Sequence, residues 1–137
     1  MRECKRAGDE KIQGIYVVPR TYRAFLRGYK NEFFLMEEGG CKILGLAYFT
    51  PGLPAEERRL DGDIAYHIAP SERRKGYGAK LLALALELCR KQGARCVCVT
   101  CRAANAASAK IIRANGGALD EQFMHKGVLR EVYWIAL

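Results

Sequence analysis

The feature that most constrains the fold is one long helical segment, from Gly76 to about Gln92. Apolar residues recur in it at the spacing of one helix face, which predicts an amphipathic helix. The predicted buried stripe consists of Leu81, Leu82, Ala85, Leu88 and Cys89. Gly93 follows as a typical C-terminal stop. Because such a stripe must be covered by another element, the chain has to fold around a sheet or a second helix.

Strand-like runs surround this helix and indicate a mixed sheet. The predicted strands cover residues 33–37, 42–49, 63–68, 95–101, 119–124 and 129–136. Gly39 and Gly40 suggest a hairpin between the first two strands. A second helix is predicted over residues 106–115, with Asn105 capping its start and Gly116 its end. This order of elements indicates an α/β (α+β) domain in which helices flank a mixed sheet.

The rest of the chain completes one domain, because 137 residues are the size of a single domain. We therefore predict one domain over residues 1–137, with the polar residues 1–13 poorly ordered. Pro19 opens a predicted helix that runs to about Lys30, since proline is tolerated in a first helical turn. Residues 50–62 contain two prolines and two glycines and predict a loop.

Composition limits where the protein works and what it binds. No apolar run approaches the roughly 18 residues that a membrane span needs, and the N-terminus lacks an apolar signal segment. We therefore expect a cytoplasmic protein without a membrane partner. The net charge of +8 favours polyanions such as nucleic acids, anionic membranes or phosphorylated cofactors. Interleaved acidic residues and the lack of an aromatic stacking platform argue against nucleic acid, which stays the weaker alternative.

Three cysteines, Cys96, Cys98 and Cys101, lie in one predicted strand. The spacing of the last two matches a zinc or redox pair, but no second ligand pair stands at a suitable distance along the chain. Residues three apart on a strand also point to opposite faces. We therefore expect small buried hydrophobic side chains and no metal site.

The segment between residues 63 and 80 carries the chemistry. A strand enters a short loop that opens directly into the long helix, and the start of a helix offers unpaired N–H groups and partial positive charge. Gly76 and Gly78 would let a ligand approach the backbone, and the run from Arg73 to Lys75 adds cations. These features suit a pyrophosphate. The glycine spacings of a P-loop or a Rossmann fingerprint are absent.

Two motifs resemble those of the GNAT N-acetyltransferases. Arg73, Gly76 and Gly78 match the family pattern of Gln or Arg, two residues, Gly, one residue, and Gly or Ala. The stretch from Asn105 to Gly117 is similar to the family's second motif helix. The ending Tyr133-Trp134-Ile135 looks like the close of one bacterial subgroup. The resemblance covers about residues 33–137 and implies the GNAT fold, with a mostly antiparallel central sheet and acetyl-CoA as co-substrate.

The resemblance also implies a cofactor site in a V-shaped opening between the strands over residues 63–68 and 95–101. Backbone groups of Ile68 and Ala69 would pair with the pantetheine arm, N–H groups from Arg73 to Gly78 would hold the pyrophosphate, and Asn105 and Ser108 would lie near the reacting end. The complete set of expected cofactor-binding residues is Ile68, Ala69, Arg73, Arg74, Lys75, Gly76, Tyr77, Gly78, Ala79, Lys80, Asn105 and Ser108.

The resemblance identifies the catalytic residues less specifically than the cofactor-binding residues. Many family members protonate the leaving thiolate with a tyrosine of the second motif helix, where this chain has Ile112. Tyr66, Tyr77, Tyr133 or water could replace it. The candidate bases are Asp61, Asp63 and His67, which strand alternation puts on one face, opposite Tyr66, unless a bulge shifts the phase.

The expected acceptor is a primary amine of a small molecule or peptide, attacking directly in a ternary complex. The family usually has two helices before its hairpin, and this chain has one predicted helix there. The acceptor site would then be either unusually open or completed by a partner subunit in a homodimer. A CoA-binding module without turnover is the main alternative, because isoleucine at position 112 cannot donate a proton.

Overall fold

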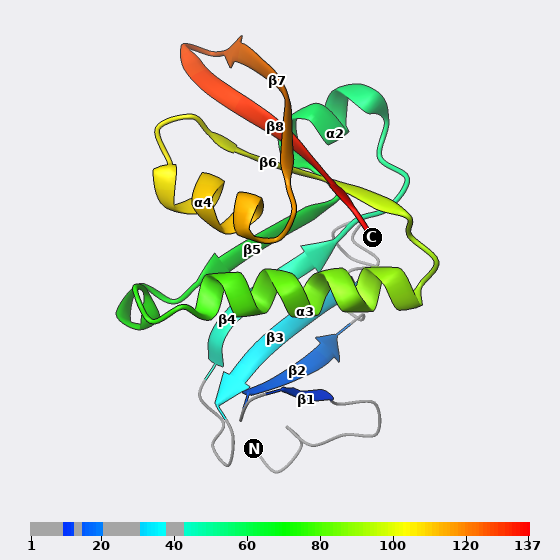
Figure 1. Cartoon of the computed structure of the whole chain (residues 1–137), viewed down its shortest axis with the longest axis vertical. Coiled ribbons are helices and arrows are strands. Elements are labelled where there is room, and N and C mark those ends of the chain that lie inside the picture. Colours follow the sequence, from blue (N-terminus) through cyan, green and yellow to red (C-terminus); the bar gives the residue numbers. More distant parts are fainter. Residues whose placement is uncertain (1–9, 13–14, 21–30, 38–42) are drawn as a thin grey trace.

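The computed structural model describes residues 10–12, 15–20, 31–37 and 43–137. Over these residues the chain forms one sheet of eight strands in the order β1-β2-β3-β4-β5-β6-β8-β7 (Figure 1). The strands are β1 (Glu10–Ile12), β2 (Ile15–Arg20), β3 (Asn31–Glu37), β4 (Ile43–Phe49), β5 (Ile64–Ile68), β6 (Cys96–Arg102), β7 (Ala118–His125) and β8 (Val128–Ala136). Neighbouring strands run antiparallel except β5 and β6, which run parallel. The expected mixed, mostly antiparallel sheet is confirmed.

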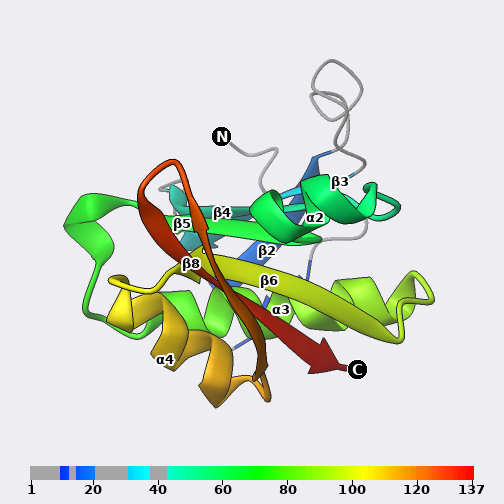
Figure 2. The same ribbon diagram turned by 90° about the horizontal axis from the view of Figure 1, so that it is seen from above.

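Helices cover both faces of this sheet. α3 (Tyr77–Lys91) and α4 (Ala106–Ala114) lie together on one face, and α2 (Ala55–Asp61) lies on the other (Figure 2). A short 3-10 helix over Pro70–Glu72 connects β5 to the loop before α3. None of these helices is long and apolar enough to cross a membrane.

The core lies between α3 and the centre of the sheet. Four residues of the predicted stripe are buried, Leu88 is half-buried, and Leu84 and Leu86 extend the buried face. On the sheet, the buried partners include Phe33, Leu35, Ile64 and Val99. The helix starts after Gly76, and Gly93 follows its end with a positive φ of 92°. The amphipathic pattern therefore predicted this element correctly, because its apolar face is what the sheet covers.

Three predicted segments differ from the structure. Pro19 and Arg20 belong to β2, which pairs with β3, so the predicted helix is wrong there; residues 21–30 lie outside the described residues. Glu10–Ile12 forms β1 within a segment expected to be irregular, and residues 1–9 and 13 are not described. The predicted loop over residues 50–62 contains α2, which has acids in its first turn and arginines in its last, as the helix dipole favours.

The cysteines are only partly as expected. Cys98 and Cys101 are buried free thiols, whereas Cys96 at the start of β6 is exposed. Among the described residues, no group of three or more His, Cys, Asp or Glu side chains is arranged to hold a metal ion.

Candidate functional site

The sheet opens between its two parallel strands. β5 and β6 are paired only at Ile64 and Val99, whereas β5 pairs with β4 from Ile64 to Ile68 and β6 pairs with β8 along its whole length. β5 therefore stays beside β4 and β6 stays beside β8, and the two parallel strands diverge after their single contact (Figure 1). The result is a V-shaped opening at the carboxyl ends of β5 and β6, as the family resemblance implies.

Alternation along β5 decides which peptide groups face this opening. Thr50 N donates to Asp63 O at 2.8 Å and Ala69 N donates to Leu44 O at 2.9 Å, so within β5 the odd-numbered residues direct their peptide groups toward β4. The N–H of Asp63, just before the strand, is an exception and donates to Cys98 O of β6 at 2.7 Å. Even-numbered residues, Tyr66 and Ile68 among them, direct theirs toward the opening. The N–H and C=O of Ala69 are both bonded within the protein, since its carbonyl accepts from Glu72 N at 2.8 Å. Of the two predicted pantetheine partners, geometry therefore favours Ile68.

The loop before α3 has the shape of an anion site. Arg74 and Gly76 have positive φ values of 64° and 81°, and α3 begins immediately afterwards at Tyr77. The N–H groups of the first helical turn have no acceptor within the helix and carry partial positive charge. Gly76 adopts the left-handed conformation without steric cost, and a Cβ there would meet nothing within 4 Å. This leaves open space in front of the helix start.

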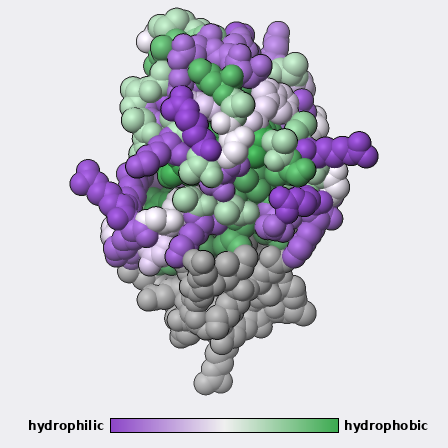
Figure 3. All heavy atoms as spheres, in the orientation of Figure 1, coloured by the Kyte–Doolittle hydropathy of each residue, from purple (hydrophilic) through white to green (hydrophobic). Residues whose placement is uncertain are grey.

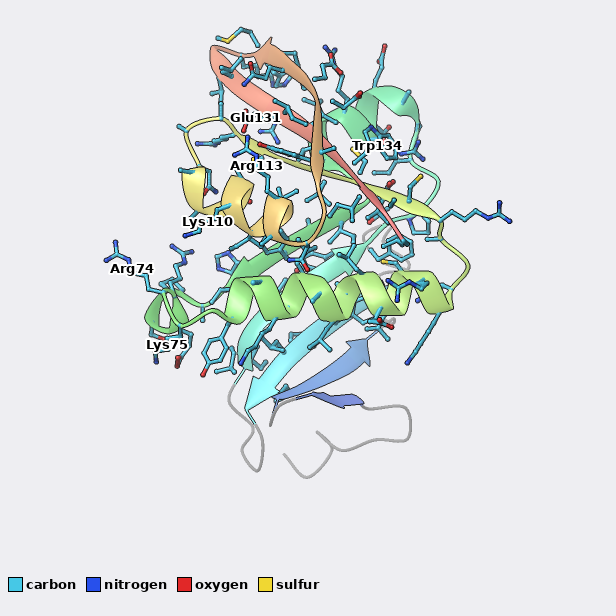
Figure 4. All side chains as sticks on the ribbon, in the orientation of Figure 1. Arg74, Lys75, Lys110, Arg113, Glu131 and Trp134 are labelled. Carbon is cyan, nitrogen blue, oxygen red and sulfur yellow. The ribbon has the colours of Figure 1, made fainter. Side chains whose placement is uncertain are left out.

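Cations surround this loop. Arg73, Arg74 and Lys75 are exposed, and Figure 4 shows Arg74 and Lys75 at one side of the molecule, beside the start of α3. Hydrophilic side chains project from the same edge in Figure 3. Lys75 Nζ lies 2.8 Å from Oε2 of the buried Glu72, and Arg73 Nε donates to Ile68 O at 3.3 Å. Arg73 therefore links the loop to the peptide edge of the opening.

Three of the remaining predicted residues at the start of α3 have contacts within the protein. A Cβ at Gly78 would lie 2.8 Å from Ile111 Cδ1 of α4, so this glycine lets the two helices approach each other. Tyr77 packs against the core, and Ala79 O accepts from Asn115 Nδ2 at 3.4 Å. Lys80 is exposed in the first turn.

The start of α4 brings polar groups to the opening. Asn105 Oδ1 accepts from Ser108 N at 3.1 Å, which confirms Asn105 as the helix cap. The Ser108 hydroxyl then lies 2.9 Å from the Tyr66 hydroxyl of β5. Ile112, one turn further along, is fully buried in the core. The polar contact at this helix is thus made by Tyr66 rather than by a residue at position 112.

A pocket of about 260 Å³ occupies the opening. Its lining consists of Leu60, Asp61, Ile64, Ala65, Tyr66, Thr100, Cys101, Asn105, Ser108 and Arg130. Three of the predicted site residues are among them, namely Tyr66, Asn105 and Ser108. Asp61, considered as a base, is there too.

The other candidate acids and bases lie outside this lining. Asp63 is buried, and its carboxylate accepts from Arg58 Nε at 3.0 Å and from Cys98 N at 2.8 Å. Tyr133 is fully buried and donates to Glu131 Oε1 at 2.9 Å. His67 is exposed on β5, on the strand face opposite Tyr66. Asp63 and Tyr133 therefore have structural partners that occupy them.

Burial changes the acidity of the groups at the pocket. It raises the pKa of Tyr66 above its usual 10.0, while the hydrogen bond with Ser108 acts in the opposite direction. Burial also raises the pKa of the Cys101 thiol, and the nearby Glu131 carboxylate adds to that effect. The pKa of Tyr133 is raised to about 12, mainly by burial. Tyr66 thus stays protonated at neutral pH and can donate a proton into the pocket.

Sequence reasoning gave no site role to six of the lining residues. Ile64 and Ala65 precede Tyr66 on β5, and the other four, Leu60, Thr100, Cys101 and Arg130, come from α2, β6 and β8. Of these six, only Cys101 was considered from the sequence, as part of a cysteine pair. Only the pairing of Arg102 with Arg130 across β6 and β8 brings Arg130 beside the opening. No local pattern in the sequence carries that information.

Comparisons with known proteins identify the family and the fold. The family model described as "Acetyltransferase (GNAT) family" matches residues 4–116. None of the curated proteins searched matches the chain. Among solved structures, yncA from Salmonella typhimurium, whose structure holds its cofactor acetyl-CoA, is 21% identical with a TM-score of 0.67, and the match covers 84% of this chain and 68% of that one.

Two further structures show the same fold. The ribosomal-protein-S5-alanine acetyltransferase from Vibrio fischeri is 9% identical with a TM-score of 0.73, over 95% of this chain and 97% of that one. The ribosomal-protein-alanine N-acetyltransferase from Brucella melitensis is 22% identical with a TM-score of 0.66, over 84% and 73% of the two chains.

Proposed function

Because the chain belongs to the GNAT acetyltransferase family, we propose that it transfers the acetyl group of acetyl-CoA to a primary amine of a small molecule or peptide. The amine attacks directly in a ternary complex. The observation that carries this proposal is the pocket in the opening between β5 and β6, with the Tyr66–Ser108 hydrogen bond on its wall. The presence of acetyl-CoA in a protein of the same fold supports the choice of cofactor.

The residues around the opening suit a CoA thioester. The first-turn N–H groups of α3 and the cations from Arg73 to Lys75 would hold its pyrophosphate. The peptide groups of Tyr66 and Ile68 that face the opening would bind the pantetheine arm, with Arg73 moving from the Ile68 carbonyl to a phosphate. The thioester supplies an acetyl carbon that is open to attack by an amine.

The reaction requires three things of the protein. A neutral amine forms the new C–N bond while the C–S bond breaks, and the proton lost from nitrogen balances the proton gained by sulfur. A backbone N–H near Ile68 would donate to the oxyanion, and one such donor can contribute about 3 kcal/mol. Tyr66 would protonate the departing thiolate, with the Ser108 hydroxyl donating to the tyrosinate that remains. Asp61, exposed at the pocket, would accept the proton of an incoming ammonium.

Calorimetry with CoA and acetyl-CoA tests the binding half of this proposal. We expect both to bind to the wild-type protein and the affinity to fall in Arg74→Met, because a loop cation next to the pyrophosphate is removed. Arg95→Met is the matched control, since Arg95 is an equally exposed arginine beyond the opposite end of α3. Absence of any binding heat for the folded wild-type protein would sink the proposal.

Thiol release from acetyl-CoA across a panel of amines tests the chemical half. We expect turnover with at least one amine. The second candidate, a CoA-binding module without turnover, is favoured by the buried Ile112 at the position where many family members have their acid. CoA binding without thiol release for every amine would establish that second candidate instead.

A further inference from the structure

The pocket has two different sides, one on each face of the sheet. Thr100 and Cys101 are neighbours on β6 and both line the pocket, although neighbouring strand residues point to opposite faces. Thr100 Oγ1 donates to Leu60 O of α2 at 3.0 Å. Tyr66 on β5 contacts Ser108 of α4 instead. The pocket therefore passes through the opening in the sheet, from the α4 face to the α2 face.

The α4 side is the side of the proposed cofactor, since α3, its N-terminal loop and α4 lie on that face (Figure 2). The acceptor then has to enter from the α2 side. The lining there includes two opposite charges, Asp61 at the end of α2 and Arg130 near the start of β8. No ion pair joins these two side chains in the part of the chain that the structure describes. A cationic and an anionic group are thus both offered to one small ligand.

A hydrogen bond within the protein positions the Arg130 guanidinium, and other N–H groups of this side chain remain able to donate. Its Nη2 donates to Leu60 O at 2.8 Å, which fixes it beside the last turn of α2. Its Nε is buried and has no hydrogen-bond partner among the described residues. Because Nε has almost no exposed surface, a ligand in the pocket reaches the guanidinium through its terminal nitrogens. A substrate carboxylate there would accept hydrogen bonds from them and pair with the positive charge.

We propose that the acceptor is a free α-amino acid, with its carboxylate on Arg130 and its amino group toward Asp61. This assignment rests on the proposed acetyltransferase function and names its substrate class. The products are the N-acetyl amino acid and free CoA thiol: nitrogen loses one proton on forming the C–N bond, and sulfur gains one on leaving carbon. A polyamine would meet the Arg130 cation with like charge, and a peptide N-terminus lacks the carboxylate next to its amine.

The test compares free amino acids with their carboxamides, which keep the amine and side chain and lack the negative charge. With thiol release as the assay, we expect kcat/KM to be roughly 10- to 100-fold higher for the acids, as a charged hydrogen-bonded pair predicts. In Arg130→Met, KM for the acid should rise by that factor while KM for the carboxamide stays within about threefold. Arg102→Met is the control, an exposed arginine directly across from Arg130 on β6 and outside the pocket lining.

Each outcome decides something. Equal use of acids and carboxamides by an active wild-type enzyme would refute the amino-acid assignment and leave the acetyltransferase function intact. A clear preference for peptides would refute it in the same way. An equal rise in KM in the Arg102 control would also refute it, because the effect would then come from the overall positive charge and not from a contact between Arg130 and the substrate. Because Arg130 also bonds to Leu60, an Arg130→Met variant that no longer binds CoA is treated as misfolded, and Arg130→Lys is measured in its place. The comparison of acids with carboxamides in the wild-type enzyme tests the assignment without any variant.

Discussion

A single hydrogen bond joins the two residues on which the proposed chemistry depends. Tyr66 and Ser108 are 42 positions apart in sequence, and their hydroxyls lie 2.9 Å apart in the opening of the sheet. Many relatives would use a tyrosine of the second motif helix, where this chain buries Ile112. In the proposed mechanism the acid hydroxyl comes instead from β5, the strand that faces this helix.

Replacing Tyr66 by Phe tests this assignment. We expect kcat to fall by about 100-fold with little change in the affinity for acetyl-CoA, because a general acid acts mainly on the chemical step. The raised pKa of Tyr66 means that its acid form persists to higher pH than usual, so the alkaline fall in wild-type kcat should lie above pH 10. That limb should be absent in the Phe variant. The measurement is kcat against pH by thiol release.

Tyr133→Phe separates the two tyrosines considered from the sequence. Its hydroxyl is buried against Glu131, so we expect stability to fall by about 1–3 kcal/mol while the rate of acetyl transfer stays within a few-fold. If the two variants exchanged these phenotypes, Tyr66 would be a packing residue and the acid would have to be sought elsewhere.

At the level of single residues, the sequence predicted the helix cap Asn105 and the polar groups Tyr66 and Ser108 at the pocket. It could not predict that the Asp63 carboxylate accepts hydrogen bonds from Arg58 and from the peptide N–H of Cys98. Nor could it predict Arg130, which reaches the pocket only through strand pairing at the end of the chain. Side-chain partners far apart in sequence are fixed by packing and leave no local pattern.

Among the elements, periodicity predicted α3, and the capping residues Asn105 and Gly116 predicted α4. α2 was missed because it buries none of its residues. Instead, Arg58 pairs with Asp63 and Arg59 pairs with Glu121 of β7, and Arg58 also lies 5.9 Å from the ring centre of Trp134. These contacts join residues far apart in the sequence and leave no helical periodicity. The seven residues of α2 therefore appeared to be a charged loop. Pro19 gave the opposite error: it predicted the start of a helix, whereas it belongs to strand β2, which pairs with β3.

The packing of α3 against α4 can be tested at Gly78. A valine there would bring its side chain into Ile111, whose Cδ1 lies 2.8 Å from the position of even a Cβ. Forcing extra carbon atoms into a packed contact typically costs about 1–3 kcal/mol. We expect Gly78→Val to lower the free energy of unfolding by this amount and to weaken CoA binding, because α4 carries Asn105 and Ser108.

The matched second change is Ile111→Ala in the same chain, which removes the obstructing carbons. The double variant should recover part of the lost stability, as measured by urea denaturation and a double-mutant cycle. Simple additivity of the two effects would show that Gly78 is needed for another reason, such as ligand access.

On the scale of the whole molecule, the sheet consists of two antiparallel halves that touch along one parallel seam. β1 to β5 form one half, and β6, β8 and β7 form the other. α3 and α4 bridge the halves on one face, and α2 lies against β6 on the other (Figure 2). The class, and the order of elements from β3 onward except α2, could be predicted from the sequence. The place where the sheet fails to close could only be carried over by resemblance, because strand pairing is decided by long-range packing.

That seam has a consequence for the exchange of amide hydrogens with deuterated water. The amides of Ala65 and His67 are directed into the β4 ladder, whereas those of Tyr66 and Ile68 face the side from which β6 diverges. Along the four consecutive residues from Ala65 to Ile68, protection should therefore alternate in the free protein, with the two even-numbered positions exchanging faster. Adding acetyl-CoA should slow those two and leave their neighbours unchanged, and uniform protection without it would mean that the seam is closed in solution.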